Sequence, residues 1–243
     1  MRPTKVWLIA SKDFRIFRKK TSILYSIIVF EVVVSIGLPF ILRRVVETTG
    51  ARAPIPVFID SFSFWFVIGS AMIPISIASY SIVGEKVQKS LEPLLATPIT
   101  DEELLAGKAT AAFIPAIIST YIGAFVFMTL VDQFTSARLG YRYLPNWNIG
   151  VILLLLAPLA CILSVGTNVL VSSRVNDVRT AQQMGAFILM PFAAVYVLSE
   201  VQILSLTIST LLLMSLVLFI VDLGVFYLVK ATFQREEILT KWS

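Results

Sequence analysis

Residues Ala109–Val131 read ATAAFIPAIISTYIGAFVFMTLV, which is 23 residues without a lysine, arginine, aspartate or glutamate. An α-helix needs about 20 mostly apolar residues to cross a bilayer, because each residue adds about 1.5 Å and the hydrocarbon is about 30 Å thick. This stretch is therefore long enough and apolar enough to span a membrane as one helix. The chain has the same character on both sides of it.

The composition of the whole chain agrees with a membrane protein. Of its 243 residues, 57% are hydrophobic and 14% are charged, whereas a soluble domain is about 45–50% apolar and about 25% charged. A soluble domain and a disordered chain are both excluded, because disorder requires low hydrophobicity and high charge. Histidine is absent and Cys161 is the single cysteine. Zinc sites, a histidine base and an intrachain disulfide are therefore excluded, and no metal site is expected.

Six stretches qualify as membrane-spanning helices, and together they predict an all-α polytopic membrane protein. Five of them contain no charged residue: 61–84, 109–131, 143–173, 180–199 and 201–221. The sixth, Thr21–Leu42, is interrupted only by Glu31, and the last one continues past Asp222 to about Val229. Within one transmembrane domain, 1–243, we place the spans at about 21–42, 58–83, 109–131, 149–171, 181–199 and 201–229.

The first 20 residues predict an amphipathic helix on the membrane surface. Drawn as a helix, residues 5–20 gather five apolar side chains on one face: Val6, Trp7, Ala10, Phe14 and Phe17. A basic amphipathic helix is typical of the membrane interface, and a cytosolic basic tail is the alternative. The following apolar segment has 22 residues and no small-residue cleavage site, so we do not expect a cleaved signal peptide.

The basic residues predict the orientation. An even number of spans puts both termini on one side, and that side then holds 15 of the 20 lysines and arginines. The other side keeps five: Arg43, Arg44, Arg52, Arg138 and Arg142. Because cytosolic segments carry the excess of basic residues, we expect both termini, and the tail 230–243, in the cytosol and the chain in the plasma membrane. The pI of 9.4 then reflects topology, and nucleic acid is not an expected partner.

The cytosolic loop between the second and third spans, 84–108, is the most informative segment. Leu91, Leu94 and Leu95 follow the spacing i, i+3, i+4 and predict a short helix with an apolar face. Pro93 is tolerated in its first turn and Pro98 ends it. The leucine face must be covered, either by the bilayer surface or by a groove in a partner protein.

The same loop predicts where the next helix begins. Thr100 opens the sequence Thr-Asp-Glu-Glu, a capping box with Glu103 three residues later, and Leu104 and Leu105 follow. The chain has no phosphate loop of the GxxxxGK[ST] or GxGxxG type. If the protein uses nucleotide energy, another chain must bind the nucleotide.

The stretch SLEPLLATPIT (Ser90–Thr100) followed by DEELLAGK (Asp101–Lys108) closely resembles the signature of the type-2 ATP-binding-cassette (ABC) exporter permeases. That signature is a Glu, then Gly-Thr-Leu-Glu, a Leu-Leu pair, Thr/Ser-Pro-Ile and later Leu-Leu-x-Gly-Lys. Twelve residues match it: Glu85, Leu91, Glu92, Leu94, Leu95, Thr97, Pro98, Ile99, Leu104, Leu105, Gly107 and Lys108. Lys89-Ser90 departs from the usual Gly-Thr, which keeps a hydroxyl but changes the local backbone freedom. Ser172–Gly185 and the tail Phe233–Trp242 also resemble the family, so the resemblance runs through the whole chain.

The resemblance implies the transmembrane permease subunit of an ATP-driven exporter, a subunit that is not itself an enzyme. Two such subunits, identical or different, would pair in the lipid membrane, each on a separate ATPase subunit. That partner would hold ATP and Mg²⁺, and this chain would bind no cofactor directly. The predicted short helix would be the coupling helix that drives alternating access. Its expected coupling residues are Glu85, Leu91, Glu92, Pro93, Leu94, Leu95, Thr97 and Pro98.

Glu31 and Asp222 are the ionisable residues placed well inside predicted spans. A carboxylate at the bilayer centre costs on the order of 2.5–3.5 kcal/mol on insertion scales, so each must be protonated, hydrogen-bonded or in contact with water. Two roles are open for each of them, lining the substrate pathway or bonding between helices. A stand-alone secondary carrier or channel that uses Glu31 and Asp222 is the alternative function.

Prolines and aromatic residues add two smaller predictions. Each of the first five spans carries one proline, which predicts kinks at Pro39, Pro74, Pro115, Pro158 and Pro191. Among them Pro115 is the best hinge candidate, although structural shaping is the more common role. Tyr141, Tyr143 and Trp147 are expected to anchor the outer membrane interface.

Overall fold

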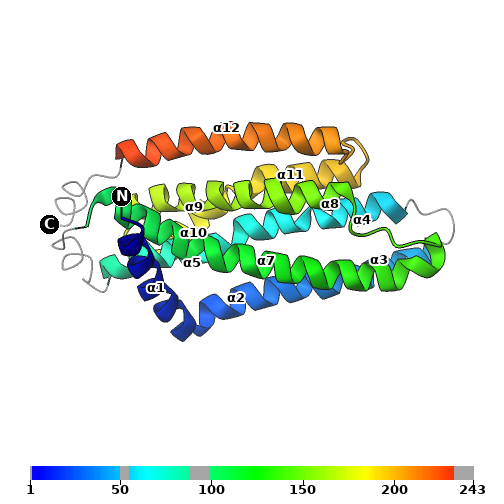
Figure 1. Cartoon of the computed structure of the whole chain (residues 1–243), viewed down its shortest axis with the longest axis horizontal. Helices are drawn as coiled ribbons and strands as arrows, with labels where there is room; N and C mark the ends of the chain where they lie inside the picture. Colours follow the sequence, from blue (N-terminus) through cyan, green and yellow to red (C-terminus); the bar gives the residue numbers. More distant parts are fainter. Residues whose placement is uncertain (1, 50–54, 88–98, 233–243) are drawn as a thin grey trace.

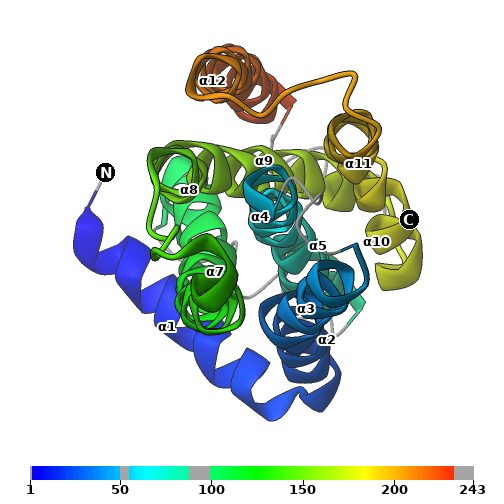
Figure 2. The ribbon, with the colours of Figure 1, turned by 90° about the vertical axis from the view of Figure 1, so that its right-hand side faces the viewer.

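The computed structural model describes residues 2–49, 55–87 and 99–232, and this part of the chain consists of helices without a strand. The predicted all-α fold is therefore confirmed. Most helices run lengthwise in a long bundle, and α1 (Pro3–Lys19) crosses one end of it (Figures 1 and 2). This end, called the α1 end below, also holds the start of α7 (Asp101–Leu139) and the end of α12 (Ile208–Thr232).

Five helical segments of the described chain are long and apolar enough to cross a membrane. They are α4 with α5 (Ile55–Ser63, Trp65–Val87), α7, α8 with η3 and α9 (Trp147–Val151, Ile152–Leu156, Ala157–Arg174), α10 with α11 (Val178–Ala186, Leu189–Glu200), and α12. The predicted first span corresponds to three consecutive elements, α2 (Thr21–Val32), η1 (Val33–Gly37) and α3 (Leu38–Thr49). These three extend along the length of the bundle beside α7 (Figure 1).

The joint between the last two helices differs from the prediction. We expected the two spans to meet at Ser199-Glu200, but α12 begins only at Ile208. Residues 201–207 form the connection, and Gln202 in it adopts a left-handed backbone with φ 59°. The connection reads VQILSLT. It could not be found by counting charges, because it has none.

The core of the bundle lies around α5. In the α4–α5 segment, 83% of the most apolar 18 residues are buried inside the protein. In α12, which lies at the edge of the bundle (Figure 2), the corresponding share is 11%. Phe64, Phe66 and Phe127 are among the largest fully buried side chains. A helix at the edge has fewer packing contacts to hold it, and van der Waals packing is a main source of helix association in membranes.

Polar side chains join α5 to α9 inside the bundle. Ser79 Oγ donates to Asn168 Oδ1 at 3.2 Å, and Asn168 Nδ2 donates to the Ser164 carbonyl at 2.8 Å. Ser164 Oγ in turn donates to the Ala71 carbonyl. Hydrogen bonds between membrane helices are worth about 0.6–2 kcal/mol each, so α5 and α9 form a firmly joined pair.

Two π-helical turns lie close to other prolines than the predicted hinge. Pro39 and Pro158 each follow a π-helical turn, η1 and η3, in which the backbone is locally widened. In η3 the Leu153 carbonyl accepts a hydrogen bond from Tyr121 Oη at 3.0 Å. Pro115 lies inside α7, which continues through it over 39 residues. The structure therefore gives no break at Pro115, the hinge candidate.

The connection from α7 to α8 is fastened to α4 by one carboxylate. Asp60 accepts hydrogen bonds from Tyr143 Oη at 3.0 Å, Asn146 Nδ2 at 2.8 Å and Asn148 Nδ2 at 2.6 Å. Burial, with the Asp60 carboxylate as the second cause, raises the pKa of Tyr143 to about 12. The phenol is therefore a permanent donor at physiological pH.

The three aromatic residues at this connection are placed differently from one another. Trp147 and Tyr141 are exposed, at 81% and 56%, and stay predicted interface anchors. Tyr143 instead points its hydroxyl at Asp60. That hydrogen bond, to a carboxylate from a distant part of the chain, was not foreseen from the sequence, and the location of Tyr143 at the membrane interface stays a prediction.

Candidate functional site

Seven of the eight expected coupling residues lie outside the described residues: Leu91, Glu92, Pro93, Leu94, Leu95, Thr97 and Pro98. The eighth, Glu85, belongs to the last turns of α5, and its side chain is not among those described. The structure does describe the frame on both sides of this segment. The end of α5 leads into it, and α7 begins directly after it.

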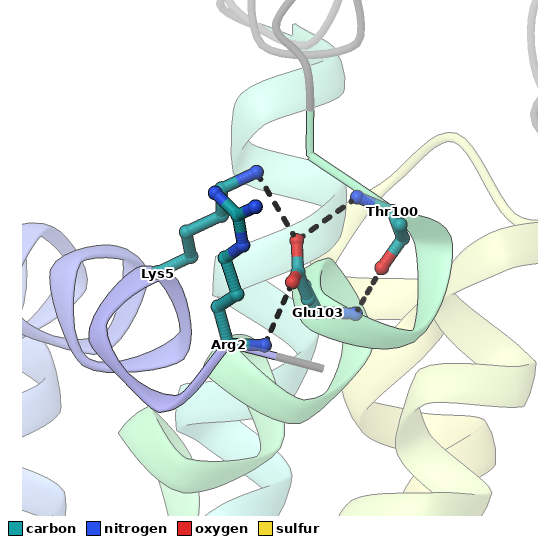
Figure 3. Close-up of polar contacts among 4 residues, drawn as sticks. All are labelled: Arg2, Lys5, Thr100 and Glu103. Carbon is teal, nitrogen blue, oxygen red and sulfur yellow. Dashed lines mark hydrogen bonds and ion pairs between the residues drawn. The ribbon is translucent and has the colours of Figure 1, made fainter.

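The capping box predicted at Thr100 is confirmed. Thr100 Oγ1 accepts from the backbone N–H of Glu103, and Glu103 Oε2 accepts from the backbone N–H of Thr100, both at 3.2 Å (Figure 3). These bonds satisfy N–H groups that a helix start leaves without partners. As a result, α7 begins at a fixed residue immediately after the predicted coupling helix.

Glu103 also holds the beginning of α1. Its Oε1 accepts from the backbone N–H of Arg2 at 2.9 Å, and its Oε2 lies 3.7 Å from Lys5 Nζ (Figure 3). Arg2 is the residue that precedes the first turn of α1. One carboxylate therefore caps α7 and ties the N-terminal helix to it.

A second, buried cluster joins α1 to both α5 and α7. Asp13 on α1 accepts from Ser81 Oγ of α5 at 2.6 Å, and Lys108 Nζ of α7 donates to the Ser81 carbonyl at 2.8 Å and to its Oγ at 3.1 Å. Lys108 Nζ lies 3.7 Å from Asp13 Oδ2, and both side chains are 3% exposed. Charges at such burial persist when they are paired and hydrogen-bonded, and these two are both.

Sequence reasoning missed this cluster, although one signal was present. Asp13 is the only acidic residue among residues 3–19, a segment rich in lysine and arginine. Asp13 has lysines and arginines near it in its own helix, so its partner on α7 was not apparent. The partner, Lys108, was noted only as a residue that matches the family signature.

Close packing of α1 on α7 completes this contact. Leu104 is buried against Ile9. Gly107 faces the same side chain so closely that a Cβ atom at position 107 would stand 2.7 Å from Ile9 Cβ. Leu104, Gly107 and Lys108 of the LLAGK stretch therefore each have a structural role in seating α1.

The helix predicted for residues 5–20 is present as α1, and the face that it buries against the rest of the protein includes two of the five predicted apolar residues, Ala10 and Phe17. Ile9, Ala10, Asp13 and Phe17 are buried, whereas Trp7 is 56% exposed. Ile9 and Asp13 belong to this buried face because they contact α7 and α5. The location of α1 on the membrane surface stays a prediction.

Glu31, the first candidate pathway residue, lies on α2 and packs against α7. Its carboxyl group occupies the space that a Cβ atom of Gly123 would fill, next to Phe66. The side chain is 9% exposed, and neither carboxylate oxygen has a hydrogen-bond partner among the described residues. Gly123 therefore provides the room in which this carboxyl group is buried.

Asp222, the second candidate, lies on α12 and faces a cavity of about 540 Å³ between α7, α9 and α12. Its side chain is 7% exposed, and neither oxygen has a hydrogen-bond partner in the part of the chain that the structure describes. At the α1 end the cavity reaches Glu102 and Lys230, whose side chains form an ion pair at 2.8 Å. Glu31 does not line this cavity. The two carboxylates predicted for one pathway are therefore not brought together.

Metal binding finds no support in the described residues, which contain no group of three or more Cys, Asp or Glu side chains placed to hold an ion. Searches of protein-family models and of curated proteins found no match to this chain.

Proposed function

We propose that this chain is the permease subunit of an ATP-driven exporter of the type-2 ABC class, docked on a separate ATPase subunit through the segment 84–108. The observation that carries the proposal is the buried Asp13–Ser81–Lys108 cluster. It joins α5 and α7, the helices on either side of the predicted coupling helix, to each other and to α1. In the proposed mechanism, this cluster passes a displacement of the segment between α5 and α7 to all three helices.

The length of α7 supports the transmission of such a displacement. It has 39 residues and is therefore about 58 Å long, nearly twice the hydrocarbon thickness. Its start is fixed by the capping box, and it continues through Pro115 without a break. In the proposed mechanism, closure of two ATPase subunits on ATP moves the coupling segments, and α7 and α5 carry the motion through the membrane to alternate access. The partner holds ATP and Mg²⁺, and this chain is not catalytic.

The finer topology belongs to the same proposal. We take α2, η1 and α3 as a sixth span, because together they cover residues 21–49 and extend along the bundle. The α1 end then faces the cytosol, in agreement with the excess of basic residues there. A second permease subunit, the same or a different chain, pairs with this one in the plasma membrane.

A stand-alone carrier or channel is the second candidate function. The observation that favours it is the burial of Glu31 and Asp222 inside the helical bundle, because an ionisable residue within a membrane span indicates a functional site. Against it, the two residues lie on different helices and do not share the cavity.

Co-purification tests the two candidates against each other. We expect the detergent-solubilised chain to co-purify with the ATPase subunit encoded beside it, because the leucine face of the coupling helix must be covered. Changing both Leu94 and Leu95 to Glu should abolish the complex. The double variant Leu212→Glu with Leu213→Glu, on α12, is the control: it adds the same two charges away from the segment 84–108 and should leave the complex intact. A complex that survives the double change at 94 and 95 refutes the coupling assignment. The absence of any ATPase partner favours the stand-alone carrier.

A further inference from the structure

The cavity between α7, α9 and α12 has the size and lining of a small-molecule site. Its volume of about 540 Å³ falls within the range of about 300–1,000 Å³ that is typical of ligand pockets. Its walls are mostly apolar, with Leu105 and Phe113 from α7, Val165 and Val169 from α9, and Val225 from α12. An apolar body of drug size therefore fits these walls.

Asp222 makes this site selective for charge. It is 93% buried, lines the cavity, and offers two carboxylate oxygens that no described residue engages. A carboxyl group in such surroundings takes up a proton unless a cation or a donor reaches it, and a bound cation stabilises its ionised form. The described structure supplies neither, so a bound ligand that brings positive charge would stabilise the site.

The other polar side chains that line the cavity, those of Glu102, Thr110 and Lys230, already have hydrogen-bond or ion-pair partners within the protein. Thr110 Oγ1 donates to the Ala106 carbonyl at 2.6 Å. Glu102 and Lys230 neutralise each other across the mouth at 2.8 Å. A divalent metal ion prefers about six oxygen ligands, which one carboxylate cannot provide. A monovalent organic cation needs a single counter-charge and an apolar surround, and both are present.

The geometry leaves room for such a ligand to lie along α12. Asp222 and Lys230 are eight residues apart, which on a helix is about 12 Å. The cavity therefore extends about 12 Å along α12 from Asp222 to Lys230, which leaves room for apolar groups around a cation that lies next to Asp222. α12 is also the least buried of the five candidate spans and lies at the edge of the bundle (Figure 2), which favours entry beside it.

We propose that the Asp222 cavity binds monovalent hydrophobic organic cations. This binding requires only the permease chain, so the result of a binding measurement does not depend on whether the chain has an ATPase partner.

The test measures binding of radiolabelled tetraphenylphosphonium to the purified full chain in nanodiscs, with empty nanodiscs subtracted. The wild type should bind this cation and should not bind tetraphenylborate, which has the same shape and the opposite charge. Asp222→Asn should weaken cation binding by about tenfold or more, because a charge pair in an apolar site is poorly screened. Glu31→Gln is the matched control, since it neutralises the other buried carboxylate outside the cavity and should leave binding unchanged.

A second variant guards against a folding defect in Asp222→Asn. Ala109→Leu fills the cavity and keeps the carboxylate, so it should also lose cation binding while the protein elutes as a single species. Equal binding by wild type and Asp222→Asn overturns the proposal, as does binding of the borate at comparable strength. Absence of cation binding by the wild type overturns it as well. If the wild type binds no cation and Asp222→Asn dissociates an oligomer, the cavity is an interface for a second copy instead.

Discussion

Replacing Lys108 by methionine is expected to lower the free energy of unfolding by about 3–5 kcal/mol and to loosen α1 from the bundle. The change leaves the Asp13 carboxylate 97% buried without its cation. It also removes the two hydrogen bonds that Lys108 donates to Ser81. Removing one partner of a buried ion pair costs more than the pair contributes, because the remaining charge stays out of water.

Thermal unfolding of the detergent-solubilised protein measures this loss, and hydrogen exchange of α1 locates it. The double variant Asp13→Asn with Lys108→Met should recover part of the stability, since neither charge of this pair remains. Lys230→Met is the matched control, because that lysine also forms an ion pair but is 60% exposed, and its loss should leave the unfolding temperature unchanged. Equal effects of Lys108→Met and Lys230→Met would contradict the assigned role of the buried cluster.

Replacing Gly107 by alanine is expected to destabilise the protein by about 1–3 kcal/mol, the usual cost of overpacking. A Cβ atom at this position would stand 2.7 Å from Ile9 Cβ, which is bonded directly to the α1 backbone. The contact therefore cannot be relieved by turning a flexible side chain, and α1 must move. In an open helical position the same change stabilises by about 0.5–1 kcal/mol, so the sign of the effect is diagnostic.

Gly224→Ala on α12 provides the control, because no atom lies within 4 Å of its added Cβ. Unfolding temperatures of the two variants, measured under the same conditions, should move in opposite directions or differ by several degrees. A Gly107→Ala protein as stable as Gly224→Ala would mean that α1 does not press on α7 at this residue.

Local signals in the sequence predicted several features correctly. The all-α fold followed from apolar length alone, and the capping box followed from Thr100 and Glu103, which lie three residues apart. Such features depend on neighbours along the chain, whose spacing is visible in the sequence. The helix at residues 3–19 was visible for the same reason.

Contacts between distant residues could not be predicted in this way. The cluster of Asp13, Ser81 and Lys108 joins three helices, and nothing in the spacing of these residues says that they meet. Asp60 stands directly before the uncharged stretch 61–84 and was not singled out, although it organises the connection near Tyr143. Glu31 and Asp222 were recognised as unusual because of their type, but their separation on α2 and α12 required the fold.

Photo-cross-linking from position 94 tests most directly whether this chain is coupled to an ATPase through the segment 84–108. Benzoyl-phenylalanine replaces Leu94 in one protein and Leu213, an exposed residue of α12, in a control, and both are irradiated in membranes that contain the partner. We predict a covalent adduct with the ATPase subunit from position 94 and none from position 213. If the two proteins co-purify but positions 91, 94 and 95 all fail to form the adduct, the coupling account is contradicted.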